Sequence, residues 1–341
     1  VKEIIKMAIS RKLASIQVVK DIIPIKDADT IEVVRVLGWN VVVKKGEFKI
    51  GDKVVYCEVD SLFPEKPEFE FLRKVNFRIK TIRLRGVYSQ GICFPLSILP
   101  VGVYNEGDDV TNLLEISKYE PPIPVDLAGE AKGAFPSFLS KTDETRIQCL
   151  EDILTKYLGT LCYYSEKIDG TSSTFYLNEG EFGVCGKNME WLDTEKNIYW
   201  QIAKKYDIEK KLRSIGRNIA IQGEIIGEGI QRNKYKLGKN ERRLYIFNAF
   251  DIDTYTYLSF NEFAQLMKDM DLETVPILET NFKLTNDIDY LTELSKGNSV
   301  INPKIRREGI VIRPLVEQID MALGRLSFKA INPEFLLKYS E

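Results

Sequence analysis

Histidine is absent from this chain of 341 residues. Its absence excludes a Ser-His-Asp triad, an H-E-x-x-H zinc helix and any histidine general base. Catalysis by this chain would therefore depend on Lys, Asp, Glu, Arg, Tyr or Cys side chains. We expect such side chains to act together with a hard metal ion held by oxygen ligands.

Other absences narrow the protein class further. The five cysteines are scattered and form no C-x-x-C pair, which argues against a disulfide framework and a structural zinc site. No apolar run reaches the ~18 residues of a membrane helix, and the first residues lack signal-peptide features. We therefore expect an intracellular, cytoplasmic protein with no membrane partner. P-loop and G-x-G-x-x-G motifs are also absent, which disfavours the P-loop and Rossmann nucleotide sites.

The chain is nearly neutral, with a net charge of -2, so a globally basic nucleic-acid binder is not indicated. Local basic patches can still act. Two such patches stand out. The first is a strand-like stretch at 77–86 with Arg78, Lys80, Arg83 and Arg85, which is either a solvated sheet face or a face that tracks phosphates. The second is a loop at 231–236 with Lys234 and Lys236, which is either a solvated hairpin or a contact for RNA.

The length suggests two domains. Short strand-like segments at 14–19, 31–36, 41–43 and 54–59 are separated by turn signals, and they predict an OB-like β-barrel at 1–116. Proline and glycine then disfavour regular structure, so we place a linker at 117–140. The remainder, 141–341, mixes predicted helices with strands that look mostly antiparallel. The predicted fold class is therefore α+β.

A lysine and an aspartate lie two residues apart at the end of a strand-like segment in this second domain. Lys167 and Asp169 point to the same side of the strand, and Gly170 permits a tight turn after them. Taken alone, the two form either an ordinary surface ion pair or a nucleophile beside a metal-binding acid. Other strands carry further polar or aromatic residues near their ends: Glu224, Phe247, Glu308 and Lys329. Transfer of a nucleotide needs an amine, carboxylates for a cation, further cations for phosphates and an aromatic face for the base.

The order of these segments resembles five motifs of the covalent nucleotidyltransferases, which include ATP-dependent RNA ligases, DNA ligases and mRNA capping enzymes. The segments are EKIDG at 166–170, QGEIIG at 222–227, FNAFDI at 247–252, EGIVIR at 308–313 and SFKAIN at 327–332. DNA ligases and capping enzymes typically carry an OB domain after the last motif, whereas here the OB-like segment comes first. This arrangement is similar to the fifth family of ATP-dependent RNA ligases.

The resemblance implies an ATP-dependent RNA ligase with an N-terminal OB domain and a nucleotidyltransferase (ATP-grasp-like) domain of mostly antiparallel sheets with helices. It would join 3′-OH and 5′-phosphate ends of RNA, at nicks in duplexes, in RNA repair, and act as a monomer. Lys167 would form the lysyl-AMP adduct, while Lys329 and Arg146 would complete the catalytic set. Mg²⁺ or Mn²⁺ would be held, directly or through its waters, by Asp169, Glu224 and Glu308. ATP would contact Glu166, Lys167, Lys187, Glu224, Phe247, Ile310 and Lys329, with Phe247 and Ile310 on opposite faces of adenine.

Two positions depart from the family pattern. Lys187 stands where many RNA ligases have arginine, and lysine lacks the bidentate fork of arginine. Ser327 replaces the first of two lysines in the last motif, which leaves Lys329, with Arg325 as a candidate substitute. The alternatives are a DNA nick ligase, a capping guanylyltransferase, and a non-catalytic OB-type nucleic-acid-binding protein with a decayed catalytic domain.

Overall fold

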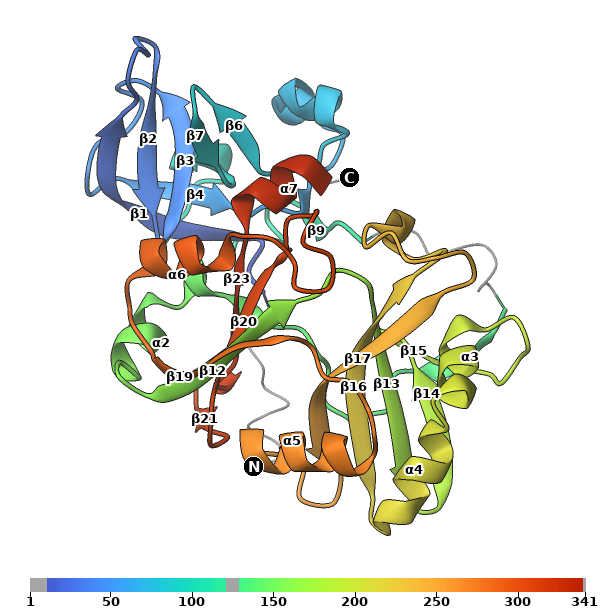
Figure 1. The fold of residues 1–341 in the computed structure, drawn as a ribbon. Helices are drawn as coiled ribbons and strands as arrows, with labels where there is room; N and C mark the ends of the chain where they lie inside the picture. The colour runs from blue at the N-terminus through green and yellow to red at the C-terminus, as the bar shows by residue number, and fades with distance from the viewer. Residues whose placement is uncertain (1–10, 121–128, 340–341) are drawn as a thin grey trace.

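The structure is a computed structural model that describes residues 11–120 and 129–339 (Figure 1). Its N-terminal part is built on a five-stranded antiparallel sheet in the order β3-β2-β1-β4-β8. The elements here are β1 Ala14–Pro24, β2 Ile31–Val36, β3 Trp39–Lys44, β4 Lys53–Cys57, β5 Ser61–Leu62, η1 Pro67–Val75, β6 Ile82–Leu84, β7 Val87–Ser89, β8 Ile92–Pro95, η2 Leu96–Ile98 and β9 Ser117–Lys118. The predicted strands therefore form one antiparallel sheet.

The N-terminal sheet is stable because β-branched and aromatic side chains alternate into two buried clusters. Val34 and Trp39 are fully buried in one cluster, and Ile16 and Phe69 are buried in the other. Each fully buried apolar side chain contributes roughly 1.5–3 kcal/mol of transfer free energy.

The chain passes between the two parts within the segment predicted as the linker. Residues 121–128 of the predicted linker 117–140 lie outside the described residues. Either side of them the chain is regular: β9 pairs with β5 of the N-terminal part, and β10 (Ala131–Ala134) pairs with β15 of the second part. The prediction that this segment lacks regular structure is therefore wrong at 117–118 and 131–134, whereas 135–140 forms no helix or strand.

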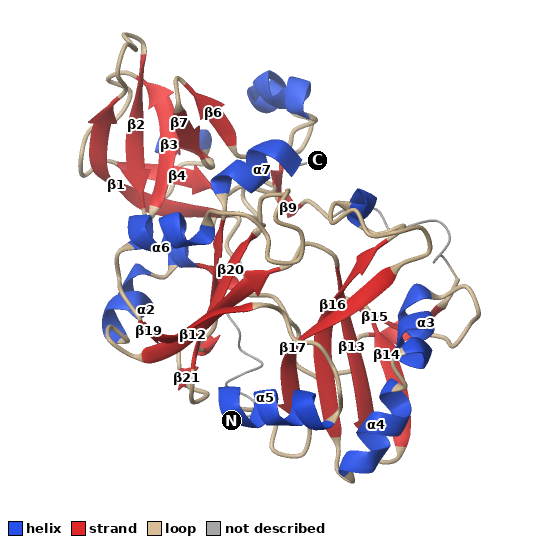
Figure 2. Cartoon of the chain, viewed as in Figure 1, coloured by secondary structure: helices blue, strands red, loops and turns tan. Residues whose placement is uncertain are grey.

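Two large sheets and the small two-stranded sheet β21-β22 form the C-terminal part (Figure 2). One has seven strands in the order β10-β15-β14-β13-β16-β17-β18, and the other has five in the order β11-β23-β20-β12-β19. All pairs are antiparallel except β11 with β23. The strands are β11 Thr145–Arg146, β12 Leu161–Lys167, β13 Thr171–Asn178, β14 Glu181–Cys185, β15 Met189–Trp191, β16 Ile219–Gly227, β17 Arg242–Asp251, β18 Thr256–Tyr257, β19 Ile277–Lys283, β20 Gly309–Pro314, β21 Ile319–Asp320, β22 Gly324–Arg325 and β23 Phe328–Ile331. The predicted α+β class with mostly antiparallel strands is confirmed.

Helices cover one side of each sheet. Side chains of α3, α4 and α5 share a core with the seven-stranded sheet, and those of α2 and α6 share a core with the five-stranded sheet. The helical elements are η4 Ile147–Cys149, α2 Glu151–Lys156, α3 Ile198–Lys205, α4 Ile208–Ile215, η5 Gln231–Asn233, α5 Phe260–Asp269, α6 Ile288–Ser295 and α7 Pro333–Tyr339. The face of the five-stranded sheet opposite α2 and α6 carries polar side chains.

The sequence at 189–212 looks helical, but it does not form a single helix. Residues Met189–Trp191 form β15, and two helices, α3 and α4, follow at Ile198–Lys205 and Ile208–Ile215. The two helices are separated by Asp207, whose φ of 50° is left-handed and incompatible with a continuous right-handed helix.

The N-terminal part docks on the C-terminal part around η4 and α6. The backbone N–H of Gly38 donates to the carbonyl of Gln148 at 2.9 Å, and Arg35 forms a bidentate ion pair with Asp289 at 2.7 and 2.9 Å. A Cβ atom at Gly38 would lie 2.6 Å from the Ile288 Cδ1 atom and 3.0 Å from the Gln148 Cα atom, so a larger residue here would displace the Ile288 side chain. Among the helices of residues 11–120 and 129–339, none has the length and apolar character needed to span a membrane.

Candidate active site

The chain crosses from one C-terminal sheet to the other at residues 168–170. Lys167 is the last residue of β12, and Thr171 is the first residue of β13. At the crossing, the N–H of Gly170 donates to the Glu224 carboxylate at 2.9 Å. A Cβ atom at Gly170 would lie 2.2 Å from the carbonyl oxygen of Ile225. Gly170 is therefore required by this close approach to β16.

Lys167 lies on the face of the five-stranded sheet that the helices do not cover. Strand alternation puts Lys167 and Arg313 on this face, while Cys162 and Ile310 point into the core beneath α2 and α6. The Lys167 ammonium donates to a Glu308 carboxylate oxygen at 2.8 Å. Burial alone would lower the pKa of Lys167, but the nearby Glu308 and Glu224 carboxylates outweigh it and raise the pKa. Without bound ligands the amine is therefore protonated.

The three predicted metal-binding acids gather around this lysine. Burial, opposed by Lys167 and assisted by Glu308, raises the pKa of Glu224 to about 8. Burial likewise raises the pKa of Glu308. The described residues contain no group of three acidic, cysteine or histidine side chains with the geometry to ligate one metal directly. Carboxylate oxygens still match the chemistry of Mg²⁺ or Mn²⁺, which keep several of their waters in such sites.

Lys329 and Arg146 lie side by side on the same face. They are register partners in the parallel pair of β11 and β23. Burial and the positive charges of Lys167 and Arg146 lower the pKa of Lys329 to about 7. The Arg146 guanidinium turns toward the N-terminal part, where it lies 3.5 Å from Asp60 and 5.6 Å from the ring centroid of Trp39. Arg146 therefore links the five-stranded sheet to the N-terminal part.

A second group of cations surrounds Asp143. The Lys187 ammonium lies 3.1 Å from this carboxylate. Burial would raise the pKa of Asp143, but Lys187, Lys118 and Lys329 outweigh it and lower the pKa. Lys118 comes from β9 of the N-terminal part, and no sequence motif singled it out. The cationic group around Asp143 thus combines lysines of the C-terminal part with one lysine of the N-terminal part.

Phe247 lies half-buried on β17, and its carbonyl accepts a hydrogen bond from Arg313 at 3.1 Å. Arg313 is held in turn by Glu144 at 2.9 Å and by the Ser327 hydroxyl at 3.0 Å. This network was not predicted from the sequence. It leaves Ser327 buried rather than available to phosphates.

One predicted nucleotide contact, Ile310, lies on the wrong face of the sheet. It is fully buried in the core beneath α2 and α6, so it cannot cover adenine. Its neighbour Val311 alternates to the side of Arg313 and Lys329. Glu166 is 1% exposed and is the register partner of Ile310, whereas odd-numbered residues of β12 share the face of Lys167. One Glu166 carboxylate oxygen accepts the Val300 N–H at 2.7 Å and the other is buried without a partner among the described residues, so its contact with ATP stays a prediction.

Arg325, the candidate substitute for the missing lysine, also lies elsewhere. It forms an ion pair with Glu317, donates to Asn248 at 2.8 Å and lies 3.6 Å from the ring centroid of Tyr257. Its role in the structure is to support β17 behind Phe247.

The basic stretch at 77–86 is not one strand. Only β6 (Ile82–Leu84) is regular, and Arg85 occupies the turn to β7. Arg78 pairs with Asp60 at 2.9 Å and lies 3.7 Å from the ring centroid of Tyr119, so it belongs to the domain interface. Arg83 and Arg85 are exposed, and Lys80 is half-buried.

The two lysines of the second basic patch differ in environment. Lys236 is exposed. The Lys234 side chain is only 9% exposed and forms an ion pair with Asp169. The prediction that both lie on an open RNA-binding loop is therefore wrong for Lys234.

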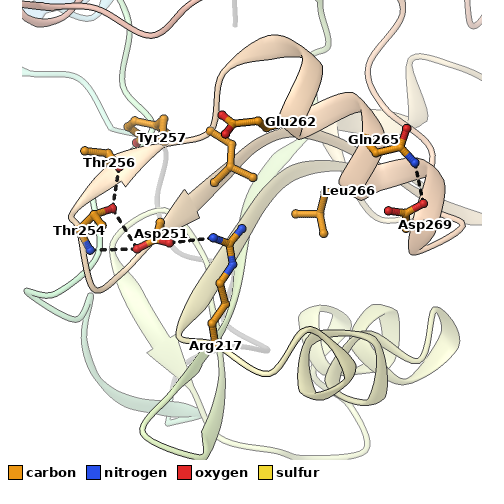
Figure 3. Close-up of a pocket in the computed structure, with 10 residues that line it drawn as sticks. Arg217, Asp251, Thr254, Thr256, Tyr257, Glu262, Gln265, Leu266 and Asp269 are labelled. Carbon is orange, nitrogen blue, oxygen red and sulfur yellow. Dashed lines mark hydrogen bonds and ion pairs between the residues drawn. The ribbon is translucent and has the colours of Figure 1, made fainter.

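The pocket drawn in Figure 3 is separate from this site. Its volume is ≈ 340 Å³, and it is bounded by α5 and the turn between β17 and β18. Arg217 and Asp251 form an ion pair of 3.0 Å there. None of the residues that surround Lys167 lines it.

Comparisons with known proteins agree with the two-part architecture. A family model described as an OB-fold domain matches residues 13–96, and one described as RNA ligase matches residues 161–331. No curated protein matches the chain.

Solved structures of the RNA ligase of Naegleria gruberi are similar over nearly the whole chain. The complex with PPi has a TM-score of 0.88 and 38% identity, with 97% of this chain and 99% of that chain covered. A mutant with ATP and Mn has a TM-score of 0.87 and 38% identity over 96% and 99% of the two chains. A mutant with AMP and Mn gives the same score and identity over 97% and 99%. The predicted family and fold class are confirmed, and the chain belongs to the RNA ligase family.

Proposed function

We propose that this RNA ligase forms a covalent lysyl-AMP on Lys167 from ATP, and then uses it to join RNA ends. The observation that supports this most is the position of Lys167. Its amine lies where two sheets meet, 2.8 Å from Glu308 and close to Glu224, Asp169 and Lys329. The similar Naegleria gruberi structures contain ATP and Mn, or AMP and Mn.

In the first step a bond forms between the Lys167 nitrogen and the α-phosphorus of ATP. The bond from that phosphorus to the bridging oxygen breaks, and pyrophosphate leaves with the electron pair. The attacking amine must lose a proton, and Glu308 is the acceptor within hydrogen-bond reach. Because burial raises the pKa of Glu308 above its ordinary value, this carboxylate is a better base than an exposed glutamate.

The carboxylates of Asp169, Glu224 and Glu308 would hold a divalent cation, with water completing its coordination. When bound, the cation supplies positive charge that neutralises phosphate oxygens and disfavours the ammonium form of the lysine. Lys329 adds a fixed cation on the same sheet face. Lys187 and Arg146 lie near enough to share the remaining phosphate charge.

Adenine would stack on Phe247, with Val311 on the other side. Phe247 is held in place from behind by Arg313, whose own position is fixed by Glu144 and Ser327. Such a buried, fully bonded support is what a precise binding site needs.

The adenylate then passes to an RNA 5′-phosphate, and a 3′-OH displaces AMP to seal a nick. We assign RNA contacts to the exposed cations Arg83, Arg85 and Lys236, with Lys80 beside them. We retain a two-domain, monomeric enzyme as part of the proposal, with β9 in the N-terminal domain and β10 in the nucleotidyltransferase domain.

A bypass experiment tests the order of steps. Lys167→Met should fail to seal a nicked RNA duplex that carries a 5′-phosphate. The same variant should seal a nick whose 5′ end is already adenylylated, because only the final displacement remains. Failure on both nicks would show that Lys167 is not confined to adenylate transfer, whereas sealing of both would remove it from the mechanism. Replacing each strand with DNA in turn measures the preference for RNA over DNA.

A further inference from the structure

Lys234 is a buried lysine whose ammonium is directed at the proposed active site. It follows η5, and its side chain is 9% exposed. The ammonium pairs with Oδ2 of Asp169. It also lies 5.3 and 5.4 Å from the ring centroids of Phe335 and Tyr339, both on α7. A lysine is normally solvated, so burial against two aromatic rings and one carboxylate indicates a specific function for its charge.

The same loop holds Asp169 a second time through the backbone. The N–H of Asp169 donates to the hydroxyl of Tyr235 at 3.0 Å. Tyr235 is 4% exposed, and its carbonyl accepts a hydrogen bond from Asn302 at 2.9 Å. Both the backbone and the carboxylate of Asp169 are therefore fixed by neighbouring residues of one loop.

Helix α7 is anchored to another of the proposed acidic residues. Asn332 precedes the helix, and its N–H donates to the Glu308 carbonyl at 2.8 Å. Its side-chain oxygen accepts the N–H of Glu334 at 3.0 Å and so caps the first turn of α7. The helix that contacts Lys234 is thus attached to the backbone of Glu308.

We propose that Lys234 is a positioning residue for Asp169, and that Phe335 and Tyr339 of α7 hold Lys234 in place for this task. The proposal rests on the proposed lysyl-AMP chemistry. The ion pair fixes one oxygen of Asp169 and orients the other for the nucleotide and its cation. The Lys234 ammonium also places a positive charge beside the divalent cation, and this charge weakens binding of that cation.

The two effects of removing Lys234 oppose each other, which gives the proposal a distinctive signature. Without the ammonium, Asp169 is more negative toward its surroundings and should bind a divalent cation more tightly. Its carboxylate is also less well oriented, so the maximal rate of adenylylation should fall. Simple loss of folded protein would lower the amplitude only, and loss of an RNA contact would leave adenylylation unchanged.

The test compares Lys234→Met with a matched control. Lys204 also pairs with an aspartate, Asp193, at 2.5 Å, and it lies 5.9 Å from the ring centroid of Trp200, but its side chain is 59% exposed. Lys204→Met should behave as wild type. For Lys234→Met we expect the single-turnover rate of lysyl-AMP formation at saturating Mn²⁺ to fall about ten-fold, which corresponds to ~1.4 kcal/mol and lies between the values for exposed and desolvated cation–π contacts. The Mn²⁺ concentration at half-maximal rate should fall about three-fold or more.

A binding measurement separates this proposal from the proposed function. Binding of Mn²⁺ in the presence of ATP is followed by the electron paramagnetic resonance signal of the free ion, in a Lys167→Met background that cannot react. Adding Lys234→Met should tighten Mn²⁺ binding, and this result would support the proposal even if the wild type made no adduct. An unchanged Mn²⁺ affinity would overturn it.

The aromatic pair provides a second variant. Phe335→Leu/Tyr339→Leu keeps the apolar bulk of α7 but removes the rings. It should shift the rate and the Mn²⁺ response in the same directions as Lys234→Met, and adding Lys234→Met to it should change little more. Fully additive effects, or a defect confined to RNA sealing, would count against a shared positioning role.

Discussion

The buried ion pair behind Phe247 makes a quantitative prediction about stability. Glu144 and Arg313 lie 2.9 Å apart, and their side chains are 12% and 3% exposed. Glu144→Gln keeps the shape and one hydrogen-bond acceptor but removes the negative charge. Two unit charges about 4 Å apart attract by ~4 kcal/mol at an effective dielectric constant of ~20. The retained hydrogen bond offsets ~1 kcal/mol of this.

We therefore expect Glu144→Gln to lower the free energy of unfolding by ~3 kcal/mol, because Arg313 remains buried without its counter-charge. With an m-value of ~2–3 kcal/mol/M, the urea midpoint should move down by ~1–1.5 M. Glu209→Gln is the matched control, since it breaks a Glu–Arg pair of 2.7 Å whose side chains are about half exposed. Exposed pairs of this kind contribute only ~0.3–0.5 kcal/mol.

The same variant has a signed pH dependence. Burial would raise the pKa of Glu144, but Arg313 and Arg325 outweigh it and lower the pKa. A lowered pKa gives stability that is complete above the ordinary glutamate pKa of ~4.3 and is lost as the pH falls through the folded value. The gap between wild type and Glu144→Gln should thus be full at pH 7 and shrink below pH ~4. A midpoint equal to that of Glu209→Gln at pH 7 would refute this reasoning.

Three further predictions concern the nucleotide site. Because the pKa of Lys329 is about 7, this lysine is mostly neutral at pH 8, and the phosphates of ATP favour its charged form. ATP binding at pH 8 should therefore take up close to one proton, and the affinity should fall as the pH rises. Calorimetry in buffers of different ionisation enthalpy should show this uptake, and Lys329→Met should abolish it. Val311→Ala should weaken ATP binding ~5-fold, whereas Ile310→Val should cost ~0.5–1.5 kcal/mol of stability and leave ATP binding unchanged; an unchanged affinity in Val311→Ala with a loss in Ile310→Val would place adenine on the other face. Ser327→Lys should lower the melting temperature and give no faster adenylylation, because the position is 3% exposed beside Arg313; a faster rate would contradict the observed packing.

The catalytic residues that could be predicted from the sequence are those at motif positions. Lys167, Asp169, Glu308 and Lys329 lie at or near strand ends and Glu224 lies within β16, and the structure brings all five to one region. Whether they perform the assigned roles stays a prediction. Their chemistry is visible in the sequence because each is a charged residue beside a buried strand.

Face assignments could not be predicted with the same success. Ile310 and Val311 are both apolar and adjacent, so a shift of one residue decides which of them meets adenine. The same parity separates Glu166 from Lys167. Only the pairing register of β12, β20 and β23 resolves the choice.

Ion pairs between residues that are far apart in the sequence also could not be predicted from sequence patterns. Lys234 pairs with an acid 65 residues away, and Arg313 pairs with one 169 residues away. The sequence of the basic loop at 231–236 did not indicate that Lys234 would be buried against α7. The segment at 77–86 was misread for a related reason, because Arg78 is drawn to Asp60 in the domain interface.

The central claim is that Lys167 is the residue adenylylated by ATP. The most direct measurement incubates the protein with Mn²⁺ and ATP labelled at the α-phosphate, then identifies the labelled peptide after digestion. We predict one labelled peptide, which contains Lys167, and no label in Lys167→Met. Label on another residue, or a labelled Lys167→Met variant, would contradict the account.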